Sequence, residues 1–394
     1  MSPLADPEQL EHGAVRQQLA EIAQRIGESV AGPAAWEVDR DGRFPFESLE
    51  AMKSERLLSA LIPLEQGGMG ASIADISNAI RIIARFCASS GSMLAMHMEQ
   101  LFVLLRHGKT EGLERRVAEI AEQQLLLANA NSEVGLGGDV MRSLNALTPD
   151  GDGWHFDKQA LAVSFGCNAD LILSTARRSP EAADTDQVVA LIPVSQLTLE
   201  ETSGWDTLGL RGTRSSGMHL VGYVSNDDIF PVPFADVANG GGGQVRHVLL
   251  TAVWTGLAEA AMFEAHKTVR AAARRNLGAT EQPAMRLAEI MADVQTARSV
   301  LAGGQKQLAE AIESDSLEDI GLIMNLRNVK IVTTNIAVKV ATTALQICGI
   351  NGFRRGQNHP LERILRDSYG GLIMVGNDRY LFENASILPA RKEI

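Results

Sequence analysis

Apolar side chains in the first third of the chain return at intervals of three and four residues. The clearest series runs from Ile82 through Phe86 and continues with Leu101, Leu104 and Leu105. This spacing places apolar side chains on one helical face, because an α-helix completes a turn in about 3.6 residues. A Pro- and Gly-containing stretch at 63–70 interrupts the pattern as a loop. The pattern predicts a helical domain over residues 1–120.

Between residues 121 and 235 the pattern changes to short apolar runs separated by Gly, Asn and Asp. Such runs, bounded by turn-forming residues, are typical of β-strands. We therefore expect a middle β domain, barrel-like in shape, over residues 121–235. The four glycines at 240–243 are typical of a flexible connection. The strand-like runs are LLLANAN, WHFDKQALAVSF, DLILSTA, QVVALIPV and MHLVGYV.

Three long segments without internal proline follow, at 246–275, 284–314 and 317–348. In the first, small and apolar residues between Leu249 and Ala261 fall on one helical face. Long helices with small contact residues pack as a bundle, and such a surface can also pair with a second copy. The order of helices, strands and helices predicts a mainly helical α+β protein whose C-terminal bundle spans residues 236–394. It argues against a doubly wound α/β fold.

The composition is that of a globular protein with a substantial core. Of the 394 residues, 45% are hydrophobic and 21% are charged. The net charge of −12 is spread along the chain without a basic stripe, so no nucleic-acid partner is expected. Three distant cysteines, the lack of a leader-like N-terminus and the lack of a long apolar run predict a cytoplasmic protein without disulfides or a membrane span.

Several common catalytic motifs are missing from the sequence. Gly108-Lys109-Thr110 has the ending of a phosphate loop, but Val103 stands where the first glycine of that loop is required. The chain contains no complete GxGxxG, HExxH or GxSxG pattern. The eight histidines do not have metal-ligand spacing, so no metal site is predicted.

Five ordered segments resemble the motifs of one enzyme family. Trp205, Gly209 and Arg211 fit the pattern W-x-x-x-G-x-R-x-[ST]. The other four segments resemble T-E-P-x-A-G-S-D, Q-x-x-G-G-x-G-[YF], P-x-E-R-x-x-R-D and P-x-x-x-G-G-x-G. They lie at Ser132–Gly135 with Asp139, at Gln346–Phe353, at Pro360–Asp367 and at Pro63–Gly70. Together the five segments resemble the acyl-CoA dehydrogenase superfamily.

This resemblance implies an N-terminal helical domain, a middle β domain and a C-terminal four-helix bundle, with a flavin between the β domain and the bundle. It implies FAD rather than FMN, because the adenosine-side segment around Gln346 is present. It also implies a homo-oligomer, either a dimer or a tetramer, in which the adenine end of the flavin reaches a neighbouring subunit. Most family members oxidise acyl thioesters.

The resemblance assigns three residues to the flavin ring. Asn131 and Ser132 take the positions of a strand that contacts the isoalloxazine ring, and Ser164 takes the position of a donor near its N5 atom. Ala162 stands where the family has a tryptophan. Its small side chain removes an aromatic wall, which leaves space for a different substrate or for another side chain.

The pyrophosphate and adenosine side is assigned in the same way. Arg274, in the segment Ala273–Gly278, takes the place of an arginine that pairs with the pyrophosphate, a role suited to the guanidinium fork. Gln346, Gly349 and Gly352 match a loop along the pyrophosphate and adenosine of a neighbouring subunit's flavin. Two alternatives stay open: Arg274 can end a solvated basic helix, and the two glycines can cap a helix.

Both positions of the family's catalytic glutamate hold other residues. Val375 replaces the glutamate of the Y-E-G-T motif, and Arg246 stands at the second known position, ten residues before Gly256. Oxidation of an acyl thioester requires a base to remove the α-proton. The base must then come from elsewhere, for example from Asp378 or Glu99, or the substrate must be more acidic.

Two further groups of residues are candidates for the site. Asn377, Asp378 and Arg379 follow the glycine of the Y-E-G-T position. We assign Asn377 and Arg379 to the cofactor and Asp378 to catalysis, with an internal ion pair as the alternative. His97 lies where monooxygenases of the superfamily often carry a histidine, so it is a candidate catalytic residue, with a structural role as its alternative.

Three functions are therefore in question. The preferred one is a flavin-dependent dehydrogenase of an acyl thioester, linked to coenzyme A or to an acyl carrier protein, that passes electrons to a separate acceptor. The first alternative is a flavin-dependent monooxygenase that is supplied by a flavin reductase. The second alternative is a flavin-binding protein without catalytic activity.

Overall fold

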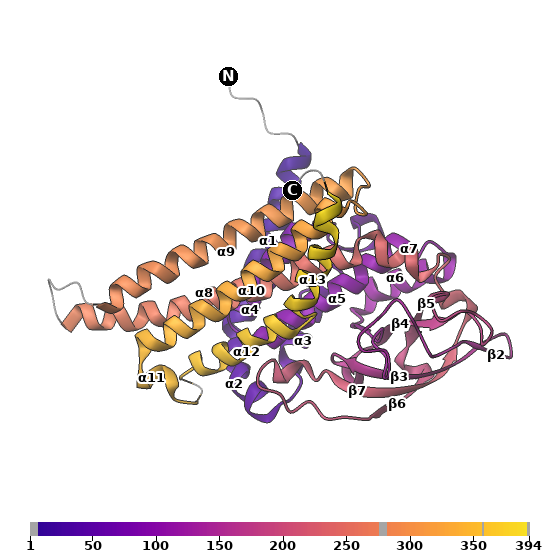
Figure 1. Ribbon diagram of the computed structural model, residues 1–394, viewed down its shortest axis with the longest axis horizontal. Helices are drawn as coiled ribbons and strands as arrows, with labels where there is room; N and C mark the ends of the chain where they lie inside the picture. Colours follow the sequence, from indigo (N-terminus) through magenta and orange to yellow (C-terminus); the bar gives the residue numbers. More distant parts are fainter. Residues whose placement is uncertain (1–6, 276–281, 357, 392–394) are drawn as a thin grey trace, which may run out of the picture.

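The computed structural model describes residues 7–275, 282–356 and 358–391. The periodic first third folds into six helices (Figure 1), and α5 is buried along most of its length at the centre of this region. Helix α4 begins with a capping box, in which Ser72 and Asp75 each accept a hydrogen bond from the other's backbone N–H. The six helices are α1 (Pro7–Ile26), α2 (Gly32–Asp41), α3 (Phe46–Ser54), α4 (Ile73–Ala84), α5 (Ala88–His107) and α6 (Glu111–Gln123).

The predicted strands form two open sheets, and the part of the chain that the structure describes contains no closed barrel. The first sheet has the order β1-β4-β5, with β1 parallel to β4 and β4 antiparallel to β5. Its strands are β1 (Leu127–Asn129), β4 (Leu171–Arg177) and β5 (Gln187–Pro193). The second sheet is antiparallel with the order β2-β3-β7-β6. Its strands are β2 (Thr148–Asp150), β3 (Gly153–Val163), β6 (Leu197–Glu201) and β7 (Ser216–Val224).

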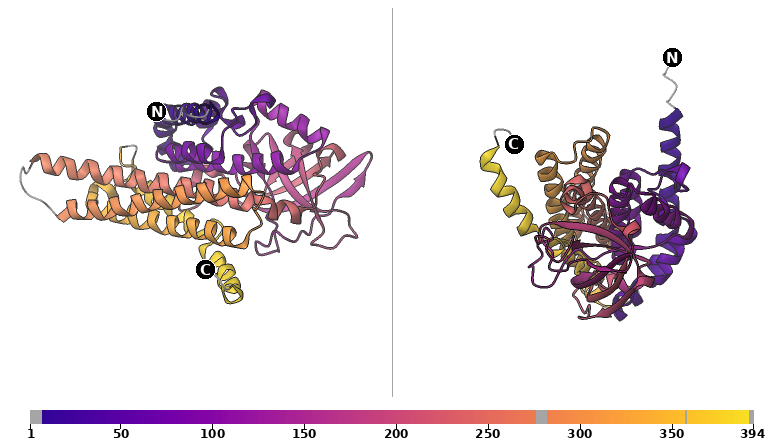
Figure 2. Two further views of the ribbon diagram at one scale, coloured as in Figure 1. Left: turned by 90° about the horizontal axis from the view of Figure 1, so that it is seen from above. Right: turned by 90° about the vertical axis from the view of Figure 1, so that its right-hand side faces the viewer.

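The three long apolar segments form the helices of a bundle, as predicted. Helix α8 packs against α9, α10 and α12, and α10 packs against α9 and α12, so these four helices make the bundle. The N-terminal helices α4 and α5 also pack on α8, which joins the two helical regions (Figure 2). The C-terminal helices are α7 (Phe234–Val237), α8 (Gly243–Arg275), α9 (Gln282–Glu313), α10 (Ile320–Cys348), α11 (Ile350–Phe353), α12 (Leu361–Ile373) and α13 (Asn377–Ile387).

The glycine run that was expected to be a flexible connection is instead a buried kink before α8. Gly241 has a φ of +106°, a conformation that favours glycine. A Cβ atom on Gly240 would lie 2.3 Å from the ring of His107, and one on Gly242 would lie 2.8 Å from Val103. These glycines allow α8 to approach α5 closely, so their role is packing rather than flexibility.

Two of the family-like segments meet where the β domain contacts the bundle. The backbone N–H of Leu210 donates to Asp367 at 2.7 Å, and a Cβ atom on Gly209 would lie 2.4 Å from the backbone oxygen of Arg366. The Arg366 guanidinium in turn pairs with Asp39 of α2. The loop before β7 is therefore fixed against both α12 and α2.

Two helical segments are long and apolar enough to cross a membrane by length and composition alone. They are 234–274, which contains α8 up to Arg274, and α10. The most apolar window of the first is 83% buried within the protein, and that of α10 is 44% buried. Core helices of folded proteins pass the same test, and both segments contribute to the bundle.

Candidate functional site

The residues assigned to the flavin ring come together at the edge of the β domain. The backbone N–H of Leu161 donates to the Ser132 carbonyl at 3.3 Å, so the segment before Glu133 runs beside the end of β3. The Ser132 hydroxyl donates to the Ala162 carbonyl and accepts from the Ala162 N–H, both at 3.2 Å. Ser164 lies two residues farther on and shares a hydrogen bond of 2.8 Å with the Ser215 hydroxyl. Ala162 itself is exposed.

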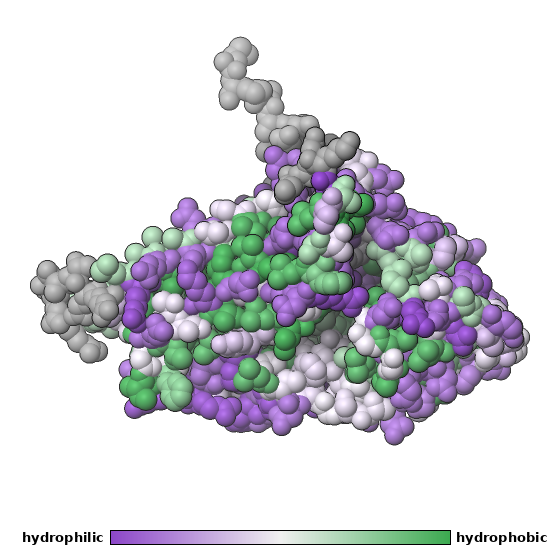
Figure 3. Space-filling model, in the orientation of Figure 1, coloured by the Kyte–Doolittle hydropathy of each residue, from purple (hydrophilic) through white to green (hydrophobic). Residues whose placement is uncertain are grey.

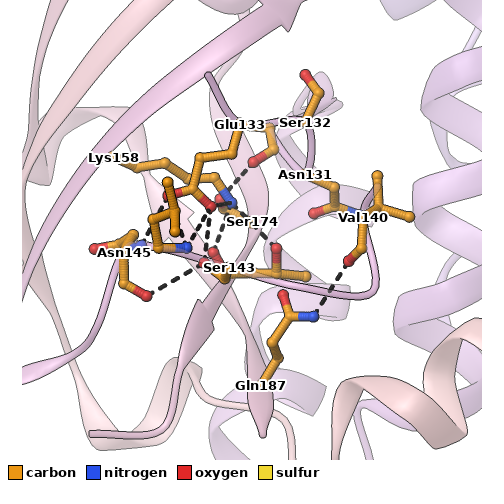
Figure 4. A network of polar contacts seen from close by, with 12 residues as sticks. Asn131, Ser132, Glu133, Val140, Ser143, Asn145, Lys158, Ser174 and Gln187 are labelled. Carbon is orange, nitrogen blue, oxygen red and sulfur yellow. Dashed lines mark hydrogen bonds and ion pairs between the residues drawn. The ribbon is translucent and has the colours of Figure 1, made fainter. Parts of the chain in front are cut away.

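A buried ion pair holds this edge in place (Figure 4). Glu133 accepts hydrogen bonds from the Ser143 hydroxyl at 2.9 Å and from the Asn145 N–H at 2.7 Å. The Lys158 ammonium lies 3.9 Å from Glu133 and donates to the Thr175 carbonyl at 2.8 Å. Burial lowers the pKa of Lys158 to about 8. The pair fixes the loop whose first residues are the predicted flavin contacts.

Sequence reasoning missed this ion pair, although a signal was present. Phe156 and Ala160 are buried and alternate with exposed positions along β3, and Lys158 lies on the same inward face. A lysine at such a position requires a buried partner, since an unpaired buried ammonium is strongly unfavourable. The pattern could have shown that a partner exists, but it could not have identified Glu133.

Asn131 has the properties of a ligand-contacting residue. Its backbone N–H donates to Asn129, whose amide donates to Gln100 of α5 at 2.8 Å. Its own side-chain oxygen is buried and accepts no hydrogen bond from any residue within the described ranges. An orphaned buried acceptor needs a donor to offset its desolvation. The edge of the isoalloxazine ring carries such an N–H donor, so Asn131 fits a flavin.

The turn between α12 and α13 closes the other side of the site. Arg379 donates to the Gly138 carbonyl at 2.9 Å, so α13 contacts the loop that follows Glu133. Asn377 is buried and accepts from the Lys330 ammonium at 2.6 Å. Lys330 also donates to the Val375 carbonyl at 3.0 Å. These contacts hold the Val375 backbone at a φ of +46°, which is unusual for a β-branched residue.

Asp378 and His97, the two residues proposed for catalysis, have very different surroundings. Asp378 is exposed in the first turn of α13, and its carboxylate makes no hydrogen bond or ion pair with the residues that the structure describes. His97 is fully buried. Its Nε2 donates to the Leu58 carbonyl at 2.7 Å, and its Nδ1 accepts from the Leu127 N–H at 3.1 Å. Burial lowers the pKa of His97 to about 4, so the ring is neutral, and these contacts favour a structural role.

Arg246 and Glu99 meet on the helical side of the site. The Nε atom of Arg246 donates to Glu99 of α5 at 2.9 Å. The neighbouring His247 ring packs edge-on against Tyr380 of α13, with 4.8 Å between the ring centres. Lys330 lies 5.7 Å from the Tyr380 ring. These residues, Glu99, Arg246, His247, Lys330 and Tyr380, are called the basic cluster below.

The charges of the basic cluster influence one another. Burial raises the pKa of Glu99, and Arg246 offsets part of this effect. Burial also lowers the pKa of His247 well below its usual value, and the cations Arg246, Arg327 and Lys330 lower it further. Burial lowers the pKa of Lys330 to about 8. The surface is hollowed between α13 and the β-strands in Figure 3.

The residues assigned to the adenosine side lie elsewhere in the chain's own fold. Arg274 is exposed near the end of α8, and Gln346 is exposed near the end of α10, where it accepts from Arg286 at 3.1 Å. Figures 1 and 2 show this end of the bundle far from the β-strands. Within one chain, these residues therefore do not join Asn131 and Ser132. Residues Asn276 to Gly278 of the arginine motif lie outside the described residues.

The two predicted glycines of this end have structural reasons of their own. Gly349 has a φ of +57° and donates its N–H to the Leu345 carbonyl at 2.8 Å, which ends α10. A Cβ atom on Gly352 would lie 2.8 Å from Cys348 and 2.9 Å from Leu361. A cavity of about 250 Å³ adjoins Gly352 and is lined also by Thr268 and Asn351. Capping explains Gly349 without a ligand, and the cavity leaves room for one beside Gly352.

Comparison with protein families decides the relationship. Residues 11–135 match the family model of the acyl-CoA dehydrogenase N-terminal domain, and residues 244–385 match that of the C-terminal domain. The chain belongs to the acyl-CoA dehydrogenase superfamily. It is therefore an acyl-CoA dehydrogenase-like flavoenzyme, and the edge that carries Asn131 and Ser132 is in keeping with this assignment.

Similar proteins from this superfamily have different activities. Cyclohex-1-ene-1-carbonyl-CoA dehydrogenase of Syntrophus aciditrophicus is 22% identical over 374 residues, covering 92% of this chain and 86% of that protein. Dibenzothiophene monooxygenase of Mycolicibacterium goodii is 26% identical over 344 residues, covering 80% of this chain and 81% of that protein. The FMN-bound TdsC of Paenibacillus sp. A11-2 has the same fold, with a TM-score of 0.80 at 20% identity over 95% of this chain and 97% of that one.

Proposed function

We propose that this acyl-CoA dehydrogenase-like protein is an FAD-dependent enzyme that oxidises an acyl thioester, with Glu99 as the proton acceptor. The observation that carries this proposal is the contact between Glu99 and Arg246. Arg246 occupies the second glutamate position of the family, and the Glu99 carboxylate lies 2.9 Å from its Nε atom. The carboxylate missing from α8 is thus replaced by one on α5 in the same part of the site.

Glu99 has the properties that a base needs. Burial raises the pKa of its carboxyl group, which makes the carboxylate a better proton acceptor than an exposed one. Arg246 favours the ionised form of the group, and Gln100 beside it connects through Asn129 to the Asn131 loop. A bound flavin would supply the acceptor for the hydride. Asp378 is the weaker candidate, because its exposed side chain is held by no described residue.

The cofactor is proposed to be FAD, although a relative of the same fold is bound to FMN. Arg274, Gln346, Gly349 and Gly352 would hold its pyrophosphate and adenosine. These residues lie at the far end of the bundle from the β domain, so they would serve the flavin of a second copy of this chain. Asn131, Ser132, Ser164, Asn377 and Arg379 would serve the ring side.

A homo-oligomer is proposed on the same grounds. Apolar side chains gather over α9 and α10 (Figure 3). Tyr369 and Ile373 of α12 and Leu381 and Phe382 of α13 are also exposed. An exposed apolar surface of this kind is typical of a contact between subunits. Whether the assembly is a dimer or a tetramer can be measured by light scattering.

The remaining partners follow from the reaction. Relatives named as acyl-CoA dehydrogenases make coenzyme A the first choice of thioester carrier, with an acyl carrier protein as the alternative. A separate electron acceptor must reoxidise the flavin. We keep the cytoplasm as the proposed location.

The test is anaerobic reduction of the FAD-loaded protein by acyl-CoA, followed as bleaching of the flavin absorbance. Glu99→Gln should slow bleaching by about 100-fold or more, because a general base contributes at least that factor. Its FAD content should be kept. Glu111→Gln, on the exposed surface of α6, is the matched control and should bleach at the wild-type rate. Loss of bleaching in Asp378→Asn with full activity of Glu99→Gln would assign the base to Asp378 instead.

Monooxygenation is the second candidate, and it is favoured by one observation. Val375 and Arg246 leave both family glutamate positions without a carboxylate, and a monooxygenase is among the relatives. Product formation that requires oxygen and a flavin reductase, without bleaching by any thioester, would establish this alternative. A protein that binds FAD and shows neither reaction would be a catalytically inactive flavin-binding protein.

A further inference from the structure

Only one of the three guanidinium nitrogens of Arg246 makes a hydrogen bond to a residue that the structure describes. Its Nε atom donates to Glu99, and neither Nη atom hydrogen-bonds to any residue that the structure describes. The side chain is 36% exposed, in contrast to 10% for its partner Glu99. Two parallel N–H groups at the end of the guanidinium are therefore open to a ligand on this side of the site.

The charges around Arg246 leave a surplus of positive charge. Arg327 pairs with Glu383 of α13, and Arg246 pairs with Glu99. Lys330 donates only to uncharged oxygens of Val375 and Asn377 within the described chain. His247 is neutral, and the Tyr380 phenol is uncharged because its pKa is raised. Three cations thus face two carboxylates, a balance that favours an anionic ligand.

We infer that Arg246 selects acyl thioesters that carry a second acidic group, because its open Nη atoms can receive a carboxylate at the end of the acyl chain. This inference rests on the proposed function and specifies its substrate class. Guanidinium binds carboxylate through two parallel, charge-assisted hydrogen bonds. A neutral acyl chain would displace water from the same Nη atoms without replacing its hydrogen bonds, so it is disfavoured.

The test compares acyl-CoA pairs of equal carbon number. Succinyl-CoA is set against butyryl-CoA and glutaryl-CoA against valeryl-CoA, and binding to the FAD-loaded protein is measured by calorimetry. The wild-type protein should bind one of the acidic ligands at least tenfold more tightly than its neutral counterpart. Arg246→Gln should abolish that preference while binding of the neutral ligand stays within about threefold. Arg178→Gln, on the β-domain surface, is the matched control and should keep the preference.

Glu99→Gln separates ligand recognition from a merely structural role. If Arg246 receives the substrate carboxylate, removing the charge of Glu99 frees the guanidinium and acidic thioesters should bind more tightly than to the wild type. If the pair only maintains the structure, Glu99→Gln and Arg246→Gln should each weaken the binding of acidic and neutral ligands to the same extent. That result, or equal wild-type affinities within each pair, would overturn the inference.

Failure of this inference can be distinguished from failure of the proposed function. A preference for acidic thioesters that depends on Arg246, without flavin bleaching, would support the binding site and reject the dehydrogenase. Bleaching by neutral and acidic thioesters with equal affinity would support the dehydrogenase and reject the selectivity. Lack of binding by every thioester tested would overturn the inference.

Discussion

Two acid–base pairs lie on either side of the site, and they differ in how completely the protein satisfies them. In the β domain, Glu133 and Lys158 are almost wholly buried, and both also bond to neighbouring backbone groups. On the helical side, Glu99 is nearly buried but Arg246 is 36% exposed, and its Nη atoms contact no polar partner among the described residues.

A structural pair can therefore be told from a pair that is available to a ligand by how many of its polar atoms are already hydrogen-bonded. A buried pair whose polar atoms are all hydrogen-bonded has no donor or acceptor free for a ligand. Removing one of its members lowers the free energy of unfolding. A pair with an open guanidinium is only partly desolvated, so removing it mainly lowers the affinity for a ligand. The Glu133–Lys158 pair in the β domain fixes a loop, whereas the Glu99–Arg246 pair on the helices leaves a positive charge open to a ligand.

The largest effect is expected from breaking the β-domain pair. Lys158→Met should lower the free energy of unfolding by about 3 kcal/mol, because Glu133 is left as an uncompensated buried charge. Urea denaturation, followed by circular dichroism, measures this change. The double variant Glu133→Gln, Lys158→Met should recover part of the loss. A loss below about 1 kcal/mol would show that the hydrogen bonds to Glu133 suffice without the lysine.

Arg246→Gln is the comparison variant in the same measurement. We expect a loss of about 1 kcal/mol, since the pair is partly open to water and Glu99, whose pKa is already raised by burial, can take up a proton when the guanidinium is removed. A loss equal to that of Lys158→Met would remove the distinction between the two pairs.

The second prediction concerns pH and sharpens the same contrast. The pKa of Lys158 is about 8 in the folded protein against an ordinary 10.5, so between these values the unfolded chain binds more protons. Stability therefore rises with pH across this window, by at most about 1.4 kcal/mol per pH unit. The stability advantage of wild type over Lys158→Met should grow from pH 8 to pH 10. Lys330 titrates in both proteins, so its contribution cancels in the stability difference between them. A constant difference would contradict the lowered pKa.

The architecture was largely predictable, because long periodic segments leave few alternatives. The segment expected at 284–314 is α9 at Gln282–Glu313, and the segment expected at 317–348 ends with α10 at Cys348. Helical periodicity over so many residues is a strong signal. The domain boundaries remain predictions, and the barrel-like shape is replaced by two open sheets.

The site was less predictable, because its contacts join distant parts of the chain. Glu99 and Arg246 were both considered from the sequence, but 147 positions separate them, so no local pattern could show that they pair. The four glycines before α8 were expected to be flexible, since composition does not reveal that His107 and Val103 pack against them. His97 fits a motif position, yet only the fold shows that its two ring nitrogens bond to the backbone.

The smallest effect on stability is expected at Arg379, because its side chain is more exposed than that of Lys158 or Arg246. Its guanidinium joins α13 to the Gly138 carbonyl at 2.9 Å and pairs with Glu383 of the same helix at 2.9 Å, and its side chain is 48% exposed. Arg379→Gln should change the free energy of unfolding by no more than about 0.5 kcal/mol, because exposed ion pairs contribute little. It should still weaken FAD binding by about two- to tenfold, as a lost hydrogen bond contributes about 1 kcal/mol. Flavin fluorescence during titration with the apoprotein measures this affinity, with Arg178→Gln as the control. Unchanged FAD affinity would show that the α13 contact with the Gly138 loop does not support cofactor binding. Arg379 would then contribute neither to stability nor to ligand binding.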